Sequence, residues 1–428
     1  MHSLIHAIAL DPSKCTGCTN CMKHCPTEAI RVKNRKAKII KDKCINCGTC
    51  IQICPFHAFS GITDSLQTIF QYPYRIALID PVLYGQFSKK VTPSQVIAGI
   101  KNYGFNDVYE TSIGSELISN YTKEYIRNSH CLPIISSSCP SIIRLIQLRF
   151  HELIKHILPI NSPVEVTASI VLNRTMKELN IPREEIGIFF ISPCTAKIYS
   201  FKEPLGIQST CVDGAISVKS LFLMISKNLS KLENTDAFCP SGKGIAWAKV
   251  GGQSKALNIE KYLAVDGIEN VMKVLDEIVN RKMNDLVFLE CQACTTGCVG
   301  GCLTVENSFL AGYRIRQLLQ EFDSCPPSFH TENIEKLDIE KFLFTEKIHP
   351  LYSNKLDLDL SKAIEKLEKI EEVLKTLPRI DCGACGSPSC RALAEDIVLG
   401  YGKEKDCMVN YKKCLLEAAI EEKRQAKG

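Results

Sequence analysis

The sequence lacks the features that mark membrane, secreted and nucleic-acid-binding proteins. No run of about 18 uncharged apolar residues occurs, and the opening residues, MHSLIHAIALDPSKC, contain no basic region followed by an apolar segment and a small-residue cleavage site. The 52 basic and 47 acidic residues give a net charge of only +5, with no basic block that would favour nucleic acid. We therefore expect a cytoplasmic protein with no membrane span.

Cysteine, in contrast, is abundant. The chain contains 23 cysteines among 428 residues, too many and too widely spread for the disulfide scaffold of a small secreted protein. Thiolate is a soft ligand that suits zinc and iron-sulfur clusters, so the spacing of the cysteines has to decide between these two kinds of site.

The cysteines and the pattern of apolar residues predict four segments and an α/β fold class. Residues 1–70 contain eight cysteines in two similar halves, and residues 72–328 alternate strand-like runs with helical stretches, as parallel sheets do. Residues 330–378 form a charged helical connector, and residues 379–428 contain five cysteines and a helical tail. A chain of this length is expected to form two or three domains.

One cysteine pattern occurs twice in residues 1–70. Each copy reads C-x2-C-x2-C-x3-C-P, which is the run of bacterial ferredoxins with two 4Fe-4S clusters, where the fourth cysteine binds the cluster of the other run. A zinc site would instead show cysteine pairs separated by a long gap. The predicted ligands of the two clusters are Cys15, Cys18, Cys21 and Cys54 for the first, and Cys25, Cys44, Cys47 and Cys50 for the second.

Three cysteine loops in residues 72–328 each follow an apolar strand-like run. Cys139 follows CLPIISSS, Cys194 follows EIGIFFISP, and Cys294 and Cys298 follow NDLVFLECQA. Because the carboxyl ends of strands in an open parallel sheet line one crevice, we predict that these four thiolates converge on one buried metal site. The alternative is that they are ordinary core cysteines, which are often buried.

These loops resemble the catalytic domain of FeFe hydrogenases over roughly residues 72–325. They read SSSCPS, SPCTAK and ECQACTTGCVGG. The resemblance implies a two-lobed parallel-sheet catalytic domain with an H-cluster, in which Cys139, Cys194, Cys294 and Cys298 hold a 4Fe-4S cube. It further implies that Cys298 bridges the cube to a two-iron unit carrying CO, cyanide and a dithiolate.

The same resemblance assigns two further residues to this cofactor. Lys197 would donate to a cyanide of the two-iron unit, since a cationic donor favours an anionic acceptor. Ser241 begins the segment SGKGIAWAKVGGQ, which looks like the glycine-rich segment before the third hydrogenase loop. Its glycines would let the backbone approach the cofactor closely.

The chain also departs from the hydrogenase pattern around the two-iron unit. Ser138 stands where active hydrogenases have a proton-relaying cysteine, and a hydroxyl relays protons less readily because its pKa is far higher. Ser192 and Gln292 replace methionines, Val164 replaces a glutamine, and Asp80 falls near the floor of the pocket. The chain is thus similar to the divergent, sensory branch of FeFe hydrogenases, and slow turnover is expected.

A last cysteine group predicts a third accessory cluster in residues 379–428. Cys382, Cys385 and Cys390 lie in DCGACGSPSC, and sixteen residues separate Cys390 from Cys407. The group resembles the small 4Fe-4S domain of Rnf-complex electron-transfer subunits and corrinoid iron-sulfur proteins. A zinc site held by these cysteines is the alternative.

The sequence therefore predicts an iron-sulfur oxidoreductase of an anaerobe that interconverts hydrogen with protons and electrons. Its cofactors would be an H-cluster and three accessory 4Fe-4S clusters, and its partner a ferredoxin-like or signalling redox protein, with homodimerisation left open. The alternative is a non-catalytic electron-transfer or cluster-handling protein without the two-iron unit, which Ser138 favours and Lys197 opposes. The direction of catalysis and the roles of Cys291 and Cys302 are open.

Overall fold

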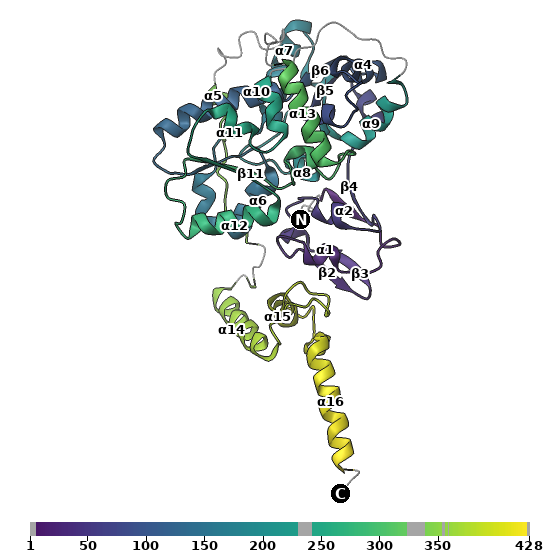
Figure 1. The fold of residues 1–428 in the computed structure, drawn as a ribbon, viewed down its shortest axis with the longest axis vertical. Coiled ribbons are helices and arrows are strands. Elements are labelled where there is room, and N and C mark those ends of the chain that lie inside the picture. The colour runs from purple at the N-terminus through teal and green to yellow at the C-terminus, as the bar shows by residue number, and fades with distance from the viewer. Residues whose placement is uncertain (1–5, 230–241, 323–338, 353–355, 358, 426–428) are drawn as a thin grey trace. The chain divides into compact units, whose positions relative to one another are not determined.

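The computed structural model describes residues 6–229, 242–322, 339–352, 356–357 and 359–425 (Figure 1). The chain divides into two compact units. The central unit comprises residues 1–8, 45–48 and 61–351, and the terminal unit comprises residues 9–44, 49–60 and 352–428. Segments from both ends of the chain thus share the terminal unit.

Two parallel sheets form the framework of the central unit. The first has the order β6-β5-β8-β9, and the second has the order β10-β11-β7. The strands of the first sheet are β5 (Tyr74–Ile79), β6 (Asp107–Glu110), β8 (Ile186–Ser192) and β9 (Gly214–Ser217). Those of the second are β7 (Ile134–Ile135), β10 (Tyr262–Asp266) and β11 (Phe288–Gln292). This arrangement confirms the predicted α/β class with parallel sheets.

Strand β8 is the centre of the first sheet, and every one of its residues is buried. A parallel strand covered on both faces reads as a continuous apolar run, which explains the sequence IGIFFIS. Successive side chains point to opposite faces. Phe189 packs with Ile79 and Ile216 on one face, while Phe190 packs with Leu78 on the other.

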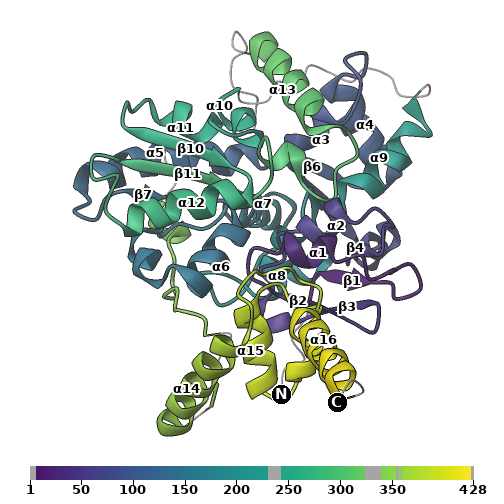
Figure 2. The same cartoon turned by 60° about the horizontal axis from the view of Figure 1, so that its bottom comes forward.

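Helices cover both faces of the sheets (Figures 1 and 2). Helices α4 and α9 contribute to the core that contains Phe189, α5 and α7 to the core that contains Phe190, and α6 and α12 to a core on the second sheet. The helices of this unit are α3 (Val82–Gly85), α4 (Pro93–Tyr103), α5 (Ser112–Asn128), α6 (Pro140–Arg149), α7 (Pro163–Leu179), α8 (Thr195–Lys202), α9 (Val218–Ser226), α10 (Gly242–Ile245), α11 (Gly252–Leu257), α12 (Ile268–Val279) and α13 (Ser308–Phe322).

Local capping signals fix where several of these helices begin. The Thr92 hydroxyl oxygen caps α4 by accepting a hydrogen bond from the Gln95 backbone N–H. The Gln95 side chain accepts one from the Thr92 backbone N–H, which completes a capping box. The Ser162 hydroxyl oxygen caps α7 by accepting from the Glu165 backbone N–H, without a reciprocal side-chain bond, and a proline occupies the first turn of both helices. One predicted strand is shorter than its apolar run CLPIISSS suggests. Pro133 has no N–H to donate to a ladder, and β7 begins only after it.

The terminal unit combines the cysteine repeat with the last helices of the chain. Its repeat contains α1 (Asn20–Lys23) and α2 (Thr49–Ile53), the antiparallel pair β2 (Ile30–Lys33) and β3 (Lys36–Ile39), and the paired strands β1 (Ile8–Leu10) and β4 (Phe59–Gly61). The later helices are α14 (Leu360–Thr376), α15 (Cys390–Val398) and α16 (Met408–Gln425). Helices α14 and α15 pack through a core that includes Ile370, Leu377 and Leu393.

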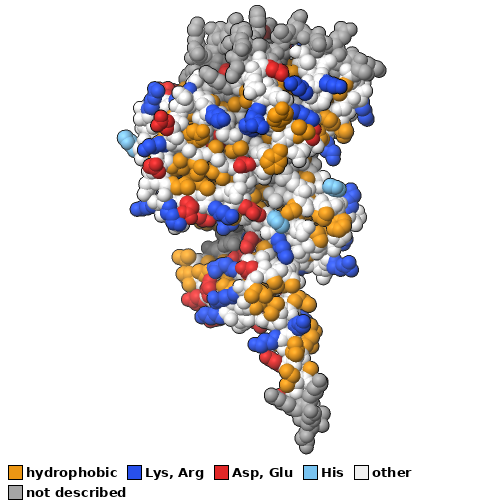
Figure 3. Space-filling model, viewed as in Figure 1, with side chains coloured by type: hydrophobic (Ala, Val, Ile, Leu, Met, Phe, Trp, Pro, Cys, Tyr) orange, Lys and Arg blue, Asp and Glu red, His pale blue; other side chains and the backbone are white. Residues whose placement is uncertain are grey.

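No helix within the described ranges is both long enough and apolar enough to cross a membrane. On the face drawn in Figure 3, basic and acidic side chains are interspersed, without a broad field of one sign. This distribution agrees with the small net charge of +5.

Candidate metal centre

The four predicted cube cysteines line one pocket in the central unit. Cys139 follows β7, Cys194 follows β8, and Cys294 and Cys298 follow β11, so their side chains meet where strands of both sheets end. The pocket has a volume of about 390 Å³. Its lining residues are Cys47, Ser138, Cys139, Pro140, Ser141, Pro193, Cys194, Lys197, Gln292, Ala293, Cys294, Gly297, Cys298 and Gly301.

Local backbone geometry aims these cysteines at the pocket. Cys139 and Cys194 sit in extended conformation immediately before α6 and α8, so each strand turns into a helix at its cysteine. Gly297 has a φ of +92°, and a Cβ there would lie 2.2 Å from Gln292 Oε1. A Cβ on Gly301 would lie 2.3 Å from the Pro193 carbonyl oxygen. Only glycine therefore lets the third loop approach the other two.

Burial favours the protonated form of three pocket thiols, those of Cys194, Cys294 and Cys298, as long as no metal holds them. It raises the pKa of Cys194 and Cys294 above the ordinary thiol value, and it raises the pKa of Cys298 to about 12. Neighbouring thiolates add to the rise at Cys294, whereas the Lys197 ammonium lowers the pKa of Cys298. Because thiolate is the ligand form, metal binding here must release protons.

Lys197 forms a buried ion pair at this pocket. Its ammonium lies 2.6 Å from Asp80 Oδ2, and both side chains are nearly inaccessible to solvent. Burial alone would lower the pKa of Lys197, but the charges of Asp80 and of the Cys298 and Cys194 thiolates outweigh it and raise that pKa. An ammonium has three N–H donors, so the bond to Asp80 leaves donors for an anionic ligand.

A second buried carboxyl group lies close to Asp80. Glu110 ends β6, as Asp80 follows β5, and it accepts hydrogen bonds from the hydroxyls of Tyr84 and Ser112. Burial, aided by the charge of Asp80, outweighs these hydrogen bonds and raises the pKa of Glu110 to about 7. The sequence prediction did not include Glu110, although a charged residue at the end of a strand-like run is the signal that could have identified it.

Ser138, Ser192 and Gln292, which stand where hydrogenases have other side chains, differ in their hydrogen bonds. Ser138 Oγ accepts a hydrogen bond of 2.9 Å from the Ser136 hydroxyl. The Ser192 hydroxyl donates to the Cys194 carbonyl at 2.8 Å, so it stiffens the second loop. The buried Oε1 of Gln292 has no hydrogen-bond partner within the described part of the chain.

Four cysteine thiolates are the donor set that holds a 4Fe-4S cube. Within the residues that the structure describes, no three His, Cys, Asp or Glu side chains are grouped as they would be around one metal ion. A cube spreads its four thiolates, because each one binds a different iron, whereas zinc draws four ligands to one point. The donor set and the glycine cradle therefore fit a 4Fe-4S cube.

Two residues that the sequence singled out lie apart from the pocket lining. Cys291 points into the core of the second sheet with Ile135 and Leu289, where it behaves as a small apolar side chain. Cys302 packs beside Thr195, whose hydroxyl oxygen lies 3.6 Å from its sulfur. Ser241, the predicted start of the glycine-rich segment, lies outside the described residues.

The glycine-rich segment after Ser241 is fixed by a buried carboxylate. Glu290, in the middle of β11, accepts hydrogen bonds from the backbone N–H groups of Gly251 and Ser254 and from the Ser254 hydroxyl. These bonds tie the start of α11 to the strand that carries the third cysteine loop.

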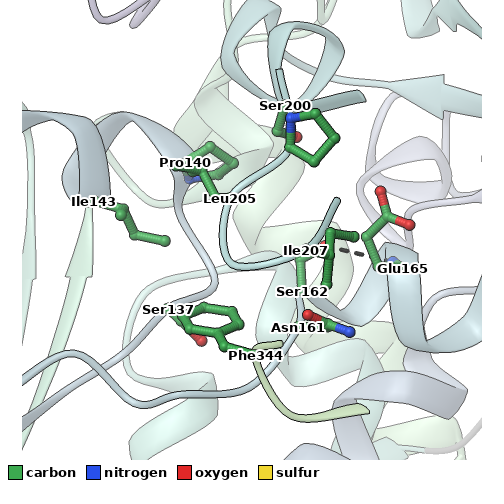
Figure 4. A pocket seen from close by; sticks show the side chains of 11 residues that line it. Ser137, Pro140, Ile143, Asn161, Ser162, Glu165, Ser200, Leu205, Ile207 and Phe344 are labelled. Atoms are coloured by element: carbon green, nitrogen blue, oxygen red, sulfur yellow. Dashed lines mark hydrogen bonds between the residues drawn. The ribbon is translucent and has the colours of Figure 1, made fainter. Parts of the chain in front are cut away.

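A second cavity adjoins the first cysteine loop. It has a volume of about 350 Å³, and Pro140 lines both cavities. Figure 4 shows Ser137, Asn161 and Glu165 around this space. Burial raises the pKa of Glu165, although its hydrogen bonds from the Thr210 hydroxyl and the Cys211 backbone oppose the rise.

In the terminal unit, the first predicted ferredoxin ligand set comes together. Cys15, Cys18, Cys21 and Cys54 line one cavity of about 310 Å³, together with Val32. Burial, reinforced by the other three thiols of the set, raises the pKa of Cys21 to about 12. The fourth cysteine thus comes from the other run, as the ferredoxin pattern implies.

The second ferredoxin set is divided between the two units. Cys25, Cys44 and Cys50 belong to the terminal unit, whereas Cys47 belongs to the central unit and lines the central pocket. The Ala29 backbone N–H donates to Cys25 Sγ at 3.2 Å, matching the bond from the Ala58 N–H to Cys54 Sγ at 3.4 Å in the other run. Ligation of a second cluster by this set stays a prediction.

The last cysteine group lies around the start of α15. Cys385, Cys390 and Cys407 pack in one cluster, while Cys382 is exposed. Asp381 Oδ1 accepts a 2.6 Å hydrogen bond from the Cys390 backbone, which closes the loop that carries the first three cysteines.

We expect the double variant Cys194→Ala with Cys294→Ala to lose the central cube. The iron content should fall by about four atoms per chain, because two of the four thiolates are missing. Iron and sulfide analysis of the anaerobically prepared protein measures this loss. Cys291→Ala is the matched control, since it removes an equally buried thiol that points into the core, and unchanged iron in the double variant would contradict the assignment.

We expect Glu110 to make the folded protein less stable as pH rises. Its folded pKa of about 7 lies above its ordinary value of 4.5, so the stability associated with the neutral acid is complete below 4.5 and is lost as pH rises through 7. The loss is on the order of 3 kcal/mol, and Glu110→Gln should remove it. Thermal unfolding at about pH 5.5 and about pH 8 measures the difference. Glu124→Gln, at an exposed position of helix α5, should leave the pH dependence unchanged.

Family models match three parts of the chain. Residues 74–261 and 243–302, together more than half of the chain, match the C-terminal domain of the iron-only hydrogenase large subunit. Residues 7–55 match the 4Fe-4S dicluster domain, and residues 377–409 match an Fe-S cluster domain. All three cysteine-rich regions therefore correspond to iron-sulfur families.

Relatives of known function are distant. Iron hydrogenase 1 of Clostridium pasteurianum is 23% identical over 259 residues, which cover 48% of this chain and 44% of that protein. The cytosolic Fe-S cluster assembly factor NAR1 of Candida dubliniensis is 29% identical over 142 residues, which cover 30% of this chain and 24% of that protein. The chain thus spans less than half the length of these relatives.

Solved hydrogenase structures share the fold. The FeFe-hydrogenase HydA1 from Chlamydomonas reinhardtii superimposes with a TM-score of 0.50 and 16% identity, covering 65% of this chain and 93% of that one. At this identity the likeness concerns the fold alone. With the family match over more than half of its length, the chain belongs to the iron-only hydrogenase large-subunit family.

Proposed function

We propose that this protein is an iron-sulfur oxidoreductase that interconverts H2 with protons and electrons at the central pocket, at low turnover and in a sensory role. The observation that carries the proposal is the meeting of four cysteines and the buried Lys197–Asp80 ion pair at one pocket where strands of two sheets end. Electrons would reach a redox partner protein through three accessory 4Fe-4S clusters.

Each pocket residue has a stated task in this proposal. Cys139, Cys194, Cys294 and Cys298 would hold the cube, with Cys298 also binding the two-iron unit. When bound, that unit supplies the redox chemistry that splits or forms H2. Lys197 holds a proton at Nζ under all ordinary conditions, so it offers a fixed positive charge to an anionic ligand.

The proton route is the weak part of the catalytic machinery. Ser138 is the pocket hydroxyl nearest to the first cube ligand in sequence, and it can pass a proton only through hydrogen bonds such as the one from Ser136. A serine hydroxyl does not ionise near neutral pH, which makes it a poor general acid or base. Low turnover follows from this single residue.

A second function, the handling of iron-sulfur clusters without H2 chemistry, is favoured by one observation. Asp80 places a carboxylate against Lys197, so the pocket floor already contains the anion that balances the lysine. An added anionic unit would have to share that ammonium with Asp80. Similarity to NAR1 supports this alternative, just as similarity to iron hydrogenase 1 supports the first.

Infrared spectroscopy separates the two functions. After anaerobic incubation with a two-iron unit, we expect CO and cyanide bands in the wild-type protein. Lys197→Met should lose these bands, because its pocket offers the anionic unit no positive charge, while Asp80→Ala should keep or strengthen them. A wild-type protein with a full complement of iron but without bands would reject the hydrogenase function and leave cluster handling.

We also expect Ser138→Cys to raise turnover. A thiol ionises much nearer to neutral pH than a hydroxyl, and a positioned acid-base group contributes roughly 10²-fold or more to a rate. Hydrogen evolution with a reduced dye measures the change. Ser141→Cys, at another serine of the same pocket lining, is the control, and an equal rise in both variants would contradict a relay role for position 138.

A further inference from the structure

A buried ion pair joins the two ends of the chain within the terminal unit. Arg31, in β2, donates from Nε to Asp396 Oδ2 in α15 at 2.7 Å, and the two side chains are only 7% and 8% exposed. Asp396 also accepts from the Ser387 hydroxyl at 2.9 Å, and Arg31 donates to the Glu28 carbonyl at 2.8 Å. Removing two charges from water is costly unless they are paired and hydrogen-bonded, so this contact specifies one geometry.

Further contacts surround this pair. The Val32 N–H donates to the Gly386 carbonyl at 2.8 Å, and Lys43 pairs with Glu395 at 3.1 Å. Gly386 has a φ of +84°, and a Cβ there would lie 1.7 Å from the Val32 carbonyl oxygen. The loop after Cys385 is therefore in backbone contact with β2, closer than any side chain would permit.

These contacts connect two cysteine sites. Val32, which binds the Gly386 carbonyl, also lines the cavity of Cys15, Cys18, Cys21 and Cys54. On the other side, Gly383 lies between Cys382 and Cys385, and a Cβ at Gly383 would lie 3.0 Å from Met22 Cε. Met22 is fully buried and is the neighbour of Cys21 in the chain. The two cysteine loops thus meet through Val32 and Met22, with no intervening layer.

We propose that this contact, which we name the cluster junction (Met22, Arg31, Val32, Gly383, Gly386, Ser387 and Asp396), is an electron-transfer junction between the C-terminal cysteine site and the first ferredoxin site. One electron leaves the reduced cluster of one site and is gained by the oxidised cluster of the other, and no bond or proton is exchanged. The C-terminal site then serves as the port through which electrons enter or leave the ferredoxin part. Arg31 and Asp396 are positioning residues that fix the distance.

The inference deepens the proposed function: it rests on the electron route through the accessory clusters and not on the H2 chemistry. It requires cluster assembly at the two cysteine sites, whereas H2 chemistry belongs to the central pocket. A cluster-handling protein with the same terminal unit would contain the same junction. Its test therefore involves neither hydrogen nor the two-iron unit.

The experiment compares electron paramagnetic resonance spectra of the fully reduced full-length protein. In the wild type we expect the signal of the first ferredoxin cluster to be broadened by magnetic interaction with the C-terminal cluster. Cys407→Ser, which lacks a ligand of the C-terminal site, should narrow that signal. Identical ferredoxin signals in wild type and Cys407→Ser, with iron analysis showing that only Cys407→Ser has lost iron, would overturn the proposal.

Arg31→Met tests the positioning role. We expect it to keep the iron and sulfide content of the wild type and yet to show the narrow ferredoxin signal of Cys407→Ser, because an unpaired Asp396 drives the two elements apart. Arg31→Lys should restore part of the broadening. Arg391→Met, which breaks the exposed pair with Glu371 in the same part of the chain, should change nothing. Persistence of the wild-type broadening in Arg31→Met would overturn the positioning role.

Should Arg31→Met fail to bind its clusters, Arg31→Met combined with Asp396→Leu provides the second variant. It leaves no buried charge unpaired, and replacing both members of a buried pair by apolar groups is often tolerated. A narrow ferredoxin signal in this folded double variant supports positioning by the ion pair, whereas a fully broadened signal shows that the remaining contacts suffice and rejects it.

Discussion

The structure depends on the burial of thiols at the ends of parallel strands. Strand β8 is buried along its whole length, so the surrounding core fixes its position. Cys194 follows this strand and lines the pocket. Buried thiols resist ionisation, so the pocket becomes a set of ligands only when metal replaces protons. Folding and cofactor binding are thereby linked. The sheets position the thiols, and the positive charge of the metal stabilises their thiolate form.

Charge balance around the pocket then decides what chemistry it supports. Lys197 is the cation and Asp80 its fixed counterion, with Glu110 behind them as a carboxyl group whose pKa is near neutrality. Such a site tolerates the loss or gain of one negative charge, because Glu110 can respond by binding or releasing a proton. This property suits a redox site of either kind, hydrogenase or cluster-handling protein.

Much of the fold and part of the site could be predicted from local patterns. The apolar runs at β5 and β8 and the cysteine spacings are short-range signals, and they led to the parallel sheets and to the four cysteines that share the pocket. The Lys197–Asp80 pair joins residues 117 positions apart, and Arg31–Asp396 joins residues 365 apart. No local periodicity encodes such pairs. The placement of Cys47 in the central unit, within a repeat that looks uniform in sequence, likewise depends on tertiary packing.

The ion pair between Arg31 and Asp396 has a consequence for how the protein is made. During synthesis the cysteine repeat leaves the ribosome long before α15 is made. Arg31 therefore cannot pair with Asp396 until most of the central unit has been translated. Until then the first ferredoxin cavity lacks the loop that contacts Val32. Completion of the terminal unit is therefore a late event in the synthesis of the chain.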